Sequence, residues 1–329
     1  MRRPIFSKRR LLWLSLFLGL YLAFCAYAAK FLVDMTLRQP HPGAMALAPP
    51  AWLMQASSDQ KAGREPQEVS VEAQDGVTLR AWYFMHSGAT RNAVIVLHGL
   101  GDTRRGMSGQ AELFLRHGYN VLMPDSRAHG ASGGELATFG ILEADDVHRW
   151  VSWLKNKLPA GGCVFGSGVS MGAAIILQAA AREPRFCGVI AEAPYASFRE
   201  IGYDRIGQPF HLGPWFGMTV GRPIIEFGMI YARSKYKVNL EEASPVAALR
   251  NSSVPVLLIA GLEDDNIPIR HSRMIHELNP NVILWEVPGA GHGSAISDAR
   301  ADYERHVMDF INFARDSRPD GVGHRAAAQ

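Results

Sequence analysis

Gly166-Ser167-Gly168-Val169-Ser170-Met171-Gly172 joins a short apolar run, Cys163–Phe165, to a helical run, Ala173–Ala181. Within it lies the pattern Gly168-x-Ser170-x-Gly172. A serine on a sharp strand-to-helix turn needs glycines two residues before and after it, because side chains there would keep strand and helix apart. Such a turn exposes the hydroxyl and directs the next amides toward it. The stretch therefore predicts a reactive serine, although glycine and serine are also common in ordinary turns.

Strand and helix patterns alternate around this turn. Buried strands are predicted at residues 93–97, 120–123, 162–165, 186–192, 254–260 and 282–287, and helices at about 107–117, 142–157, 171–182, 270–278 and 298–315. Before them, two alternating runs flank Gln74-Asp75-Gly76 and predict a β-hairpin over residues 69–84. These patterns predict one α/β domain over residues 67–316, with a mostly parallel central sheet and helices on both faces.

The N-terminus combines a basic head with a long apolar run. Residues 1–10 carry five basic side chains and no acid, and Leu11–Ala29 runs 19 residues without a charge. At about 1.5 Å per residue this run matches the hydrocarbon thickness of a bilayer. We expect residues 1–33 to form a transmembrane signal anchor, with the N-terminus cytoplasmic and the body periplasmic or otherwise outside the cytosol. The alternative is a secreted protein whose signal peptide is cleaved near Ala26-Tyr27-Ala28.

Three further segments lie outside the predicted sheet. Residues 34–66 contain five prolines and a polar stretch, which predicts a linker. Residues 195–243 interrupt the strand–helix alternation and are expected to form a helical lid at the C-terminal edge of the strands. The aromatic and methionine side chains of this lid are expected either to line an acyl pocket or to pack the lid onto the body. Residues 317–329 are expected to be a flexible tail.

Polar residues follow three other predicted strands. They are His98-Gly99-Leu100-Gly101-Asp102, Gly261-Leu262-Glu263-Asp264-Asp265 and Gly289-Ala290-Gly291-His292-Gly293. The C-terminal ends of parallel strands meet at one edge of a sheet, where ligands bind. Ser170, Asp264 and His292 therefore come together in the chain order serine, acid, histidine, which is typical of one large class of hydrolases.

Residues 67–316 resemble the α/β-hydrolase superfamily, and within it the bacterial membrane-anchored serine hydrolases of the dienelactone hydrolase/serine aminopeptidase-like branch. The motifs that carry the resemblance are His98-Gly99, Asp125–Ser132, Gly168–Gly172, Gly261-x-x-Asp264-x-x-Ile267-Pro268 and Gly291-His292-Gly293. Two positions depart from the family pattern. Ala128 and Ala173 stand where glycine is frequent, and neither change removes a reacting group.

The residues and the resemblance imply the same catalytic roles. Ser170 is the expected nucleophile, His292 the base that activates it, and Asp264 the acid that orients the imidazole. The backbone N–H groups of Leu100 and Met171 are the expected oxyanion hole.

Other polar residues near the strand ends have simpler interpretations. His98 and His129 are expected to brace the loops around the site, and Asp125 and Arg127 to pair within their own loop. Asp265 is an alternative to Asp264, and Glu192 is a remoter acid. Cys163 and Cys187 begin two neighbouring strands. They could pair if the body lies outside the cytosol, but buried free thiols are the more common outcome.

Composition limits the remaining classes. The formal charge of +3 comes from the basic head, because the other residues carry 29 basic against 31 acidic side chains. We therefore expect no nucleic-acid partner. The spacing of His, Cys and acidic residues predicts no metal site, and no glycine-rich loop predicts a dinucleotide, so no cofactor is expected.

The sequence favours a membrane-anchored serine hydrolase that cleaves carboxylic esters with acyl or lipid-like groups. A serine peptidase or aminopeptidase and an acyl-thioesterase are the enzymatic alternatives. An inactive hydrolase scaffold that acts as a binding protein is the alternative from another class. The expected substrate is a small or lipid-like acyl compound, and the sequence does not define its chain length or the oligomeric state.

Overall fold

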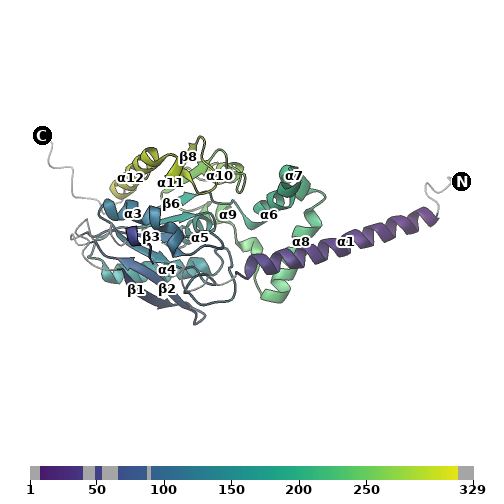
Figure 1. Ribbon diagram of the computed structural model, residues 1–329, viewed down its shortest axis with the longest axis horizontal. Coiled ribbons are helices and arrows are strands. Elements are labelled where there is room, and N and C mark those ends of the chain that lie inside the picture. The colour runs from purple at the N-terminus through teal and green to yellow at the C-terminus, as the bar shows by residue number, and fades with distance from the viewer. Residues whose placement is uncertain (1–7, 40–48, 54–65, 87–89, 318–329) are drawn as a thin grey trace. The chain divides into compact units, whose positions relative to one another are not determined.

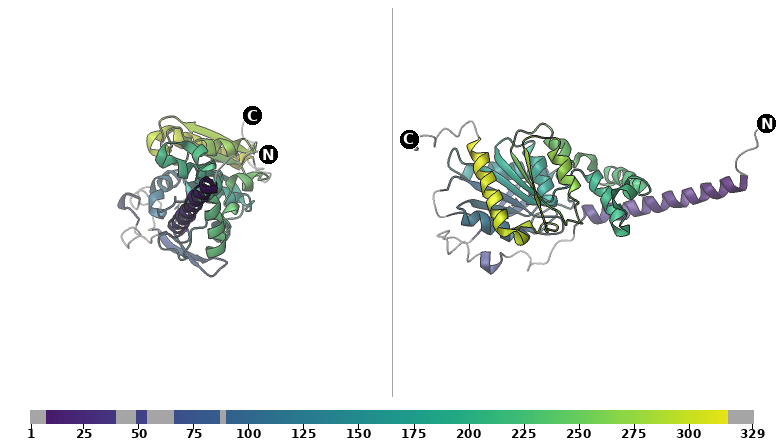
Figure 2. Two further views of the ribbon diagram at one scale, coloured as in Figure 1. Left: turned by 90° about the vertical axis from the view of Figure 1, so that its right-hand side faces the viewer. Right: turned by 90° about the horizontal axis from the view of Figure 1, so that it is seen from above.

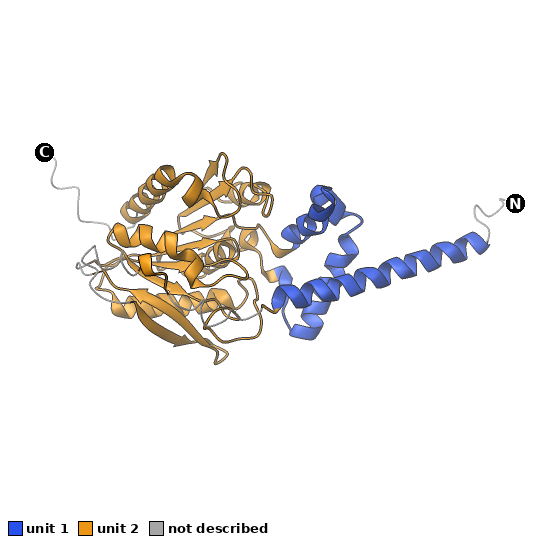
Figure 3. Ribbon diagram, in the orientation of Figure 1, with its two compact units in different colours: residues 1–37, 199–241 blue, residues 38–198, 242–329 orange. Residues whose placement is uncertain are grey.

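The computed structural model describes residues 8–39, 49–53, 66–86 and 90–317 (Figure 1). The chain divides into two units, residues 1–37 with 199–241 and residues 38–198 with 242–329 (Figure 3). Most of the predicted linker, most of the basic head and nearly all of the predicted tail lie outside the described residues.

The larger unit is built on an eight-stranded sheet with the order β1-β2-β4-β3-β5-β6-β7-β8. β1 and β2 form the predicted antiparallel hairpin, β2 pairs antiparallel with β4, and the other neighbours are parallel. The mostly parallel sheet predicted from the sequence is confirmed. The strands are β1 (Gln67–Glu72), β2 (Thr78–Phe84), β3 (Ala93–Leu97), β4 (Asn120–Pro124), β5 (Val164–Val169), β6 (Phe186–Glu192), β7 (Val256–Gly261) and β8 (Val282–Val287).

Helices of the larger unit cover both faces of the sheet (Figure 2). α3 and α12 pack against one face, where their apolar side chains join the main core cluster. α4 and α5 pack together on the other face. The helices of this unit are α3 (Ser108–Arg116), α4 (Glu143–Lys157), α5 (Met171–Ala180), α9 (Pro245–Leu249), α10 (Arg270–His276), α11 (Ala295–Asp298) and α12 (Arg300–Asp316).

β5 is longer than the sequence predicts. It continues through Gly166 and Gly168 to Val169, so that only Ser170 forms the turn. A Cβ on Gly166 would lie 2.4 Å from Cγ1 of Ile176, in α5. This glycine therefore allows α5 to pack closely on the sheet and does not break the strand.

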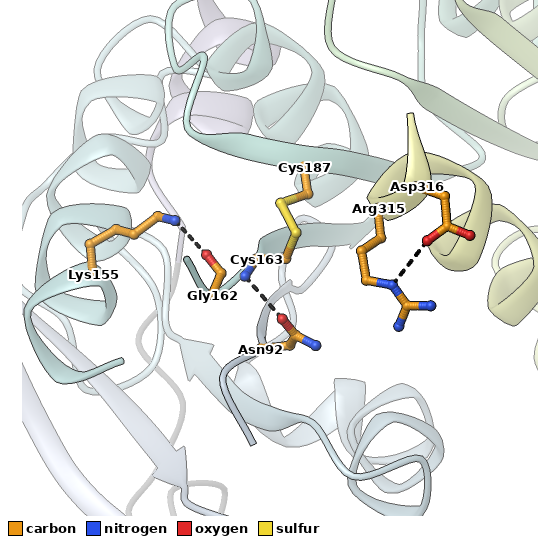
Figure 4. Close-up of a disulfide and its surroundings, with 7 residues drawn as sticks. All are labelled: Asn92, Lys155, Gly162, Cys163, Cys187, Arg315 and Asp316. Carbon is orange, nitrogen blue, oxygen red and sulfur yellow. Dashed lines mark hydrogen bonds and ion pairs between the residues drawn. A yellow bond between two sulfur atoms is a disulfide. The ribbon is translucent and has the colours of Figure 1, made fainter. Parts of the chain in front are cut away.

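A disulfide joins β6 to the residue that precedes β5. Cys163 and Cys187 are bonded, with their Cα atoms 5.6 Å apart, and the N–H of Cys163 donates to Oδ1 of Asn92 (Figure 4). The expectation of two free thiols is wrong. The sequence places both cysteines at strand starts, but the pairing also depends on the register, which shifts between Val164 and Phe165.

The smaller unit combines the N-terminal helix with the long insertion. Its helices are α1 (Lys8–Leu37), α6 (Phe198–Gly207), α7 (Gly213–Met218) and α8 (Arg222–Tyr231). One stripe of α1, formed by Cys25, Ala29, Val33 and Leu37, is buried, and α8 packs on α1. The insertion is helical, as predicted, and α1 extends four residues beyond the predicted anchor.

α1 is long and apolar enough to cross a membrane. A signal sequence near an N-terminus meets the same criteria of length and composition. The apolar side chains of its first two-thirds are largely exposed, as those of a helix surrounded by lipid would be.

Candidate active site

Ser170 occupies a strained turn between β5 and α5. Its φ of 56° and ψ of −117° lie in a region that non-glycine residues rarely adopt. The backbone N–H of Ser170 donates to the carbonyl of Glu192 at 2.9 Å, and its carbonyl accepts from Ala174 at 3.0 Å. These two bonds fix the backbone of Ser170 at the end of β5.

The two motif glycines are required by close backbone contacts. A Cβ on Gly168 would lie 2.4 Å from the carbonyl oxygen of Gly172. A Cβ on Gly172 would lie 2.3 Å from the carbonyl oxygen of Leu97, in β3. Any side chain at either position would therefore push backbone apart and move the serine.

His292 reaches Ser170 from the loop after β8. Its Nε2 lies 3.0 Å from Oγ of Ser170, and its Nδ1 lies 2.8 Å from Oδ2 of Asp264. The backbone of this loop passes closely over the end of β7, where a Cβ on Gly261 would lie 2.2 Å from the carbonyl oxygen of Ala290. The structure thus brings together the three side chains that the sequence selected.

The carboxylate of Asp264 is fixed by its own loop. Its Oδ1 accepts the N–H groups of Asn266 and Ile267 at 2.9 and 2.8 Å, which leaves Oδ2 for His292. Asp264 is buried, whereas Asp265 is exposed. The alternative acid, Asp265, does not take the position next to the imidazole.

The three hydrogen-bonded side chains are arranged for proton transfer from the hydroxyl of Ser170 to the imidazole of His292. The imidazole can accept the hydroxyl proton at Nε2 while Nδ1–H donates to the carboxylate, which stabilises the resulting imidazolium. The imidazole of His292 is about one-quarter exposed, so a substrate can approach it from solvent.

Two backbone N–H groups lie beside Ser170, those of Leu100 and Met171. A Cβ on Gly99 would lie 3.4 Å from Cβ of Ser170, so the loop after β3 passes next to the serine. Leu100 follows Gly99, and Met171 is the first residue of α5. Within the part of the chain that the structure describes, neither amide donates a hydrogen bond to another protein group. Both amides are therefore available to an oxygen that carries negative charge.

His98 and His129 brace the loop after β3. The N–H of Ser126 donates to Nε2 of His98 at 3.0 Å, and Nδ1–H of His98 donates to the carbonyl of Gly99 at 2.8 Å. Since one ring nitrogen accepts, the ring is neutral, and burial lowers the pKa of His98 accordingly.

His129 makes the same pattern of contacts. Its Nε2 accepts from Gly101 at 3.3 Å, and its Nδ1–H donates to the carbonyl of Arg127 at 2.9 Å. The prediction that these two histidines support the loops of the site is confirmed.

The expected pairing of Asp125 with Arg127 is wrong. Arg127 makes a two-pronged ion pair with Asp146, with both bonds at 2.7 Å, and also contacts Asp75. Asp125 instead accepts the backbone N–H of Arg104 at 2.8 Å, and its Oδ2 lies 3.3 Å from Nε of that arginine. The partners come from distant parts of the chain, which the loop sequence does not reveal.

Glu192 has a larger role than the sequence indicates. Its side chain is buried at the end of β6, where Oε1 accepts the N–H of Ala295 at 2.9 Å. Oε2 has no hydrogen-bond partner among the described residues. Burial raises the pKa of Glu192 to about 7, although the hydrogen bond from Ala295 and the nearby His292 oppose the shift. Only its position at a strand end marked this residue in the sequence.

Comparison with known protein families identifies the family of this chain. The model of the alpha/beta hydrolase family matches residues 94–306, which include Ser170, Asp264 and His292. Because the match covers more than half of the chain, the protein belongs to the alpha/beta hydrolase family.

Individual relatives extend the likeness over most of the chain. The protein YqkD of Bacillus subtilis is 29% identical over 69% of this chain and 73% of its own length. The structure of the esterase Pf2001 of Pyrococcus furiosus is 27% identical, with a TM-score of 0.62 over 78% of this chain and 95% of that one. A thermostable monoacylglycerol lipase of Bacillus sp. strain H-257 is 29% identical over 30% of this chain and 38% of its own length.

Proposed function

We propose that the protein is a serine hydrolase that cleaves carboxylic esters through an acyl-enzyme intermediate. The observation that carries this proposal is the hydrogen-bonded line from Oγ of Ser170 through His292 to Asp264, with distances of 3.0 and 2.8 Å. The strained backbone at Ser170 supports it, because such strain is concentrated at functional positions.

In this mechanism, Oγ of Ser170 attacks the ester carbonyl while its proton passes to Nε2 of His292. The carbonyl oxygen becomes an oxyanion, which accepts the N–H groups of Leu100 and Met171. Each such donor contributes about 3 kcal/mol of transition-state stabilisation. His292 then donates the proton to the leaving alcohol, and the same base activates the water that releases the acid. Asp264 holds the imidazole in the correct tautomer throughout.

An acyl or lipid-like ester is the substrate class that we favour. The esterase and the monoacylglycerol lipase among the similar proteins support this choice. A serine peptidase or an acyl-thioesterase would use the same three side chains, so these remain the enzymatic alternatives. A binding protein without activity would not need the hydrogen bonds between Ser170, His292 and Asp264, and this observation favours an enzyme.

We further propose that α1 is a retained membrane anchor and that the hydrolase unit lies outside the cytosol. Cleavage after Ala28 would remove Tyr21 and Cys25, which contact or face the insertion, and would uncover α8. The disulfide between Cys163 and Cys187 favours an oxidising compartment. The basic residues before α1 favour a cytoplasmic N-terminus.

A fluorophosphonate probe tests the enzymatic proposal. The full-length protein should be labelled, Ser170→Ala should not be, and Ser297→Ala should be labelled like the wild type, because Ser297 is an exposed serine of the neighbouring α11. Labelling that persists in Ser170→Ala would exclude Ser170 as the nucleophile. Turnover of aminoacyl anilides without turnover of p-nitrophenyl acyl esters would replace the esterase proposal with the peptidase alternative.

Topology needs a separate measurement. A reporter that is active only outside the cytosol, fused after residue 329, should be active in cells. Activity of a cytosolic reporter at the same position would contradict the proposed orientation.

A further inference from the structure

The insertion exposes an unusually apolar stretch. Residues 206–221, called here the apolar segment, contain no Asp, Glu, Lys or Arg. Large apolar side chains are exposed along it, namely Phe210, Leu212, Trp215, Met218 and Val220. The sequence suggested that such residues line an acyl pocket or pack onto the body; within their own unit these five side chains are exposed. The polar side chains Gln208 and His211 lie in the same stretch. Exposed apolar side chains that cluster along one short segment of a protein often have a partner.

One hydrogen bond ties the apolar segment to α1. The hydroxyl of Tyr21 donates to the carbonyl of Val220. Tyr21 lies ten residues after Leu11, the start of the charge-free run, and eight before its end at Ala29. At 1.5 Å per residue, Tyr21 is about 15 Å along a run that is about 28 Å long. If this run crosses the bilayer, Val220 is held beside its hydrocarbon portion.

The packing of α8 on α1 fixes this arrangement. The buried stripe of α1 contains the small residues Cys25 and Ala29, and a Cβ on Gly228 of α8 would lie 3.3 Å from Cγ2 of Val33. Small residues at a helix contact let the backbones approach, which is how helices associate in lipid. The insertion is therefore bound to the anchor helix over several turns.

Polar and aromatic side chains lie just after the C-terminal end of the charge-free run of α1. Lys30 pairs with Asp34 at 2.7 Å, and the hydroxyl of Tyr236 donates to Asp34 at 2.6 Å. Lys30 also lies over the ring of Tyr231. Tyrosines and ion pairs at the end of an apolar run are typical of the membrane–water interface. Arg222, the first charge after the apolar segment, pairs with Glu226 and limits how deep the segment can lie.

Several polar groups at the C-terminal end of the apolar segment have hydrogen-bond partners within the unit, which lowers the cost of placing them in hydrocarbon. The hydroxyl of Thr219 donates to the carbonyl of Trp215 at 2.7 Å. The N–H of Gly221 donates to the carbonyl of Phe216 at 2.8 Å. The carbonyl of Val220 accepts from Tyr21, so these groups of the turn between α7 and α8 do not need water as a partner.

We propose that the apolar segment is immersed in the lipid bilayer beside α1, in the half of the membrane nearer the C-terminal end of that helix. The partner of this surface is lipid hydrocarbon. The inference rests on the proposed anchoring by α1 and adds that the insertion itself is a membrane-embedded element.

Fluorescence quenching in vesicles tests this proposal on the full-length protein. Single cysteines are introduced in a Cys25→Ala background and labelled with a polarity-sensitive thiol dye, and the protein is reconstituted in phosphatidylcholine–phosphatidylglycerol vesicles. Met218→Cys and Val220→Cys report on the apolar segment. Ser234→Cys is the matched control, because Ser234 is exposed in the same unit but lies among charged residues. Phe17→Cys reports on α1 itself.

The expected result is a blue-shifted emission at positions 218 and 220 that spin-labelled lipid quenches and aqueous iodide does not. Position 234 should show the reverse. Equal iodide quenching at 218, 220 and 234, with lipid quenching at 17, would overturn the immersion of the segment but leave the anchor intact. Absence of lipid quenching at 17 would overturn the anchor and, with it, this inference. Fluorophosphonate labelling of each variant shows that the hydrolase unit is folded.

Discussion

The carboxylate of Glu192 accepts a 2.9 Å hydrogen bond from the backbone N–H of Ala295, three residues after His292. The main-chain carbonyl of Glu192 accepts the N–H of Ser170 at the same distance. One buried residue therefore connects the turn that carries the hydroxyl to the loop that carries the imidazole. The ionisation state of Glu192 should therefore affect both the turn of Ser170 and the loop of His292.

Glu192→Gln should change how stability depends on pH. Burial holds the proton of Glu192 until about pH 7, whereas the unfolded chain releases it near 4.5. Because the native state binds the extra proton in this window, the stabilisation is complete below pH 4.5 and is lost as pH rises through 7. The loss amounts to about 3 kcal/mol. Glutamine keeps the acceptor for Ala295 but does not titrate. Denaturant unfolding from pH 4 to 8 should show this difference, and parallel pH profiles would contradict it.

Asp264→Asn should lower kcat by about 10³- to 10⁴-fold with a smaller effect on KM, because the amide no longer stabilises the imidazolium of His292. Asp265→Asn is the matched control, since Asp265 is the exposed neighbour. Steady-state hydrolysis of a p-nitrophenyl ester measures both. Equal losses in the two variants would mean that Asp264 has no special role.

Gly168→Ala should destabilise the protein by about 1–3 kcal/mol, because the new methyl group would meet the backbone of Gly172 and Ala173. It should also lower fluorophosphonate labelling, since the serine turn must move. Gly109→Ala is the control: its Cβ would make an ordinary 3.8 Å contact with Ile296 in the helical setting of α3, so stability should stay the same or rise. Similar stability of the two variants would argue against a tight turn.

Replacing Cys163 and Cys187 together by alanine should cost about 3 kcal/mol, the loop-closure contribution of a bond that spans 24 positions. The reduced wild type should show a similar loss under denaturant. Cys25→Ala, which removes the free cysteine, should leave the effect of reductant unchanged. If reductant has no effect on the unfolding midpoint of the wild type, the two cysteines are not paired in the purified protein.

Much of the architecture is predictable because the signals are local. The fully buried strands β3 and β6 have the bounds that their apolar runs predict, and the glycines around Ser170 mark the turn. The convergence of Ser170, Asp264 and His292 is also predictable, because each of them follows a strand that its local sequence predicts. The disulfide depends on which strands become neighbours, and the partners of Arg127 come from α4 and from the turn between β1 and β2. No local pattern encodes these contacts.

The sequence also does not predict that the insertion forms one unit with α1. Its aromatic residues are compatible with a pocket, with packing on the body or with another apolar partner, because all three use the same side chains. The contacts of Tyr21 and Gly228 place α1 against the insertion, which the sequence pattern does not reveal. The position of the insertion as a lid over the strand ends stays a prediction.

The two amides that bind Oδ1 of Asp264 have an evolutionary consequence. They lie two and three residues after the carboxylate, so an acid moved one place along the chain, at Asp265, would forfeit this fork of donors. If Asp264 acts as proposed, a lineage that lost it would not recover the activity through the neighbouring acid, Asp265. Reversion at the same codon is therefore the simplest path back.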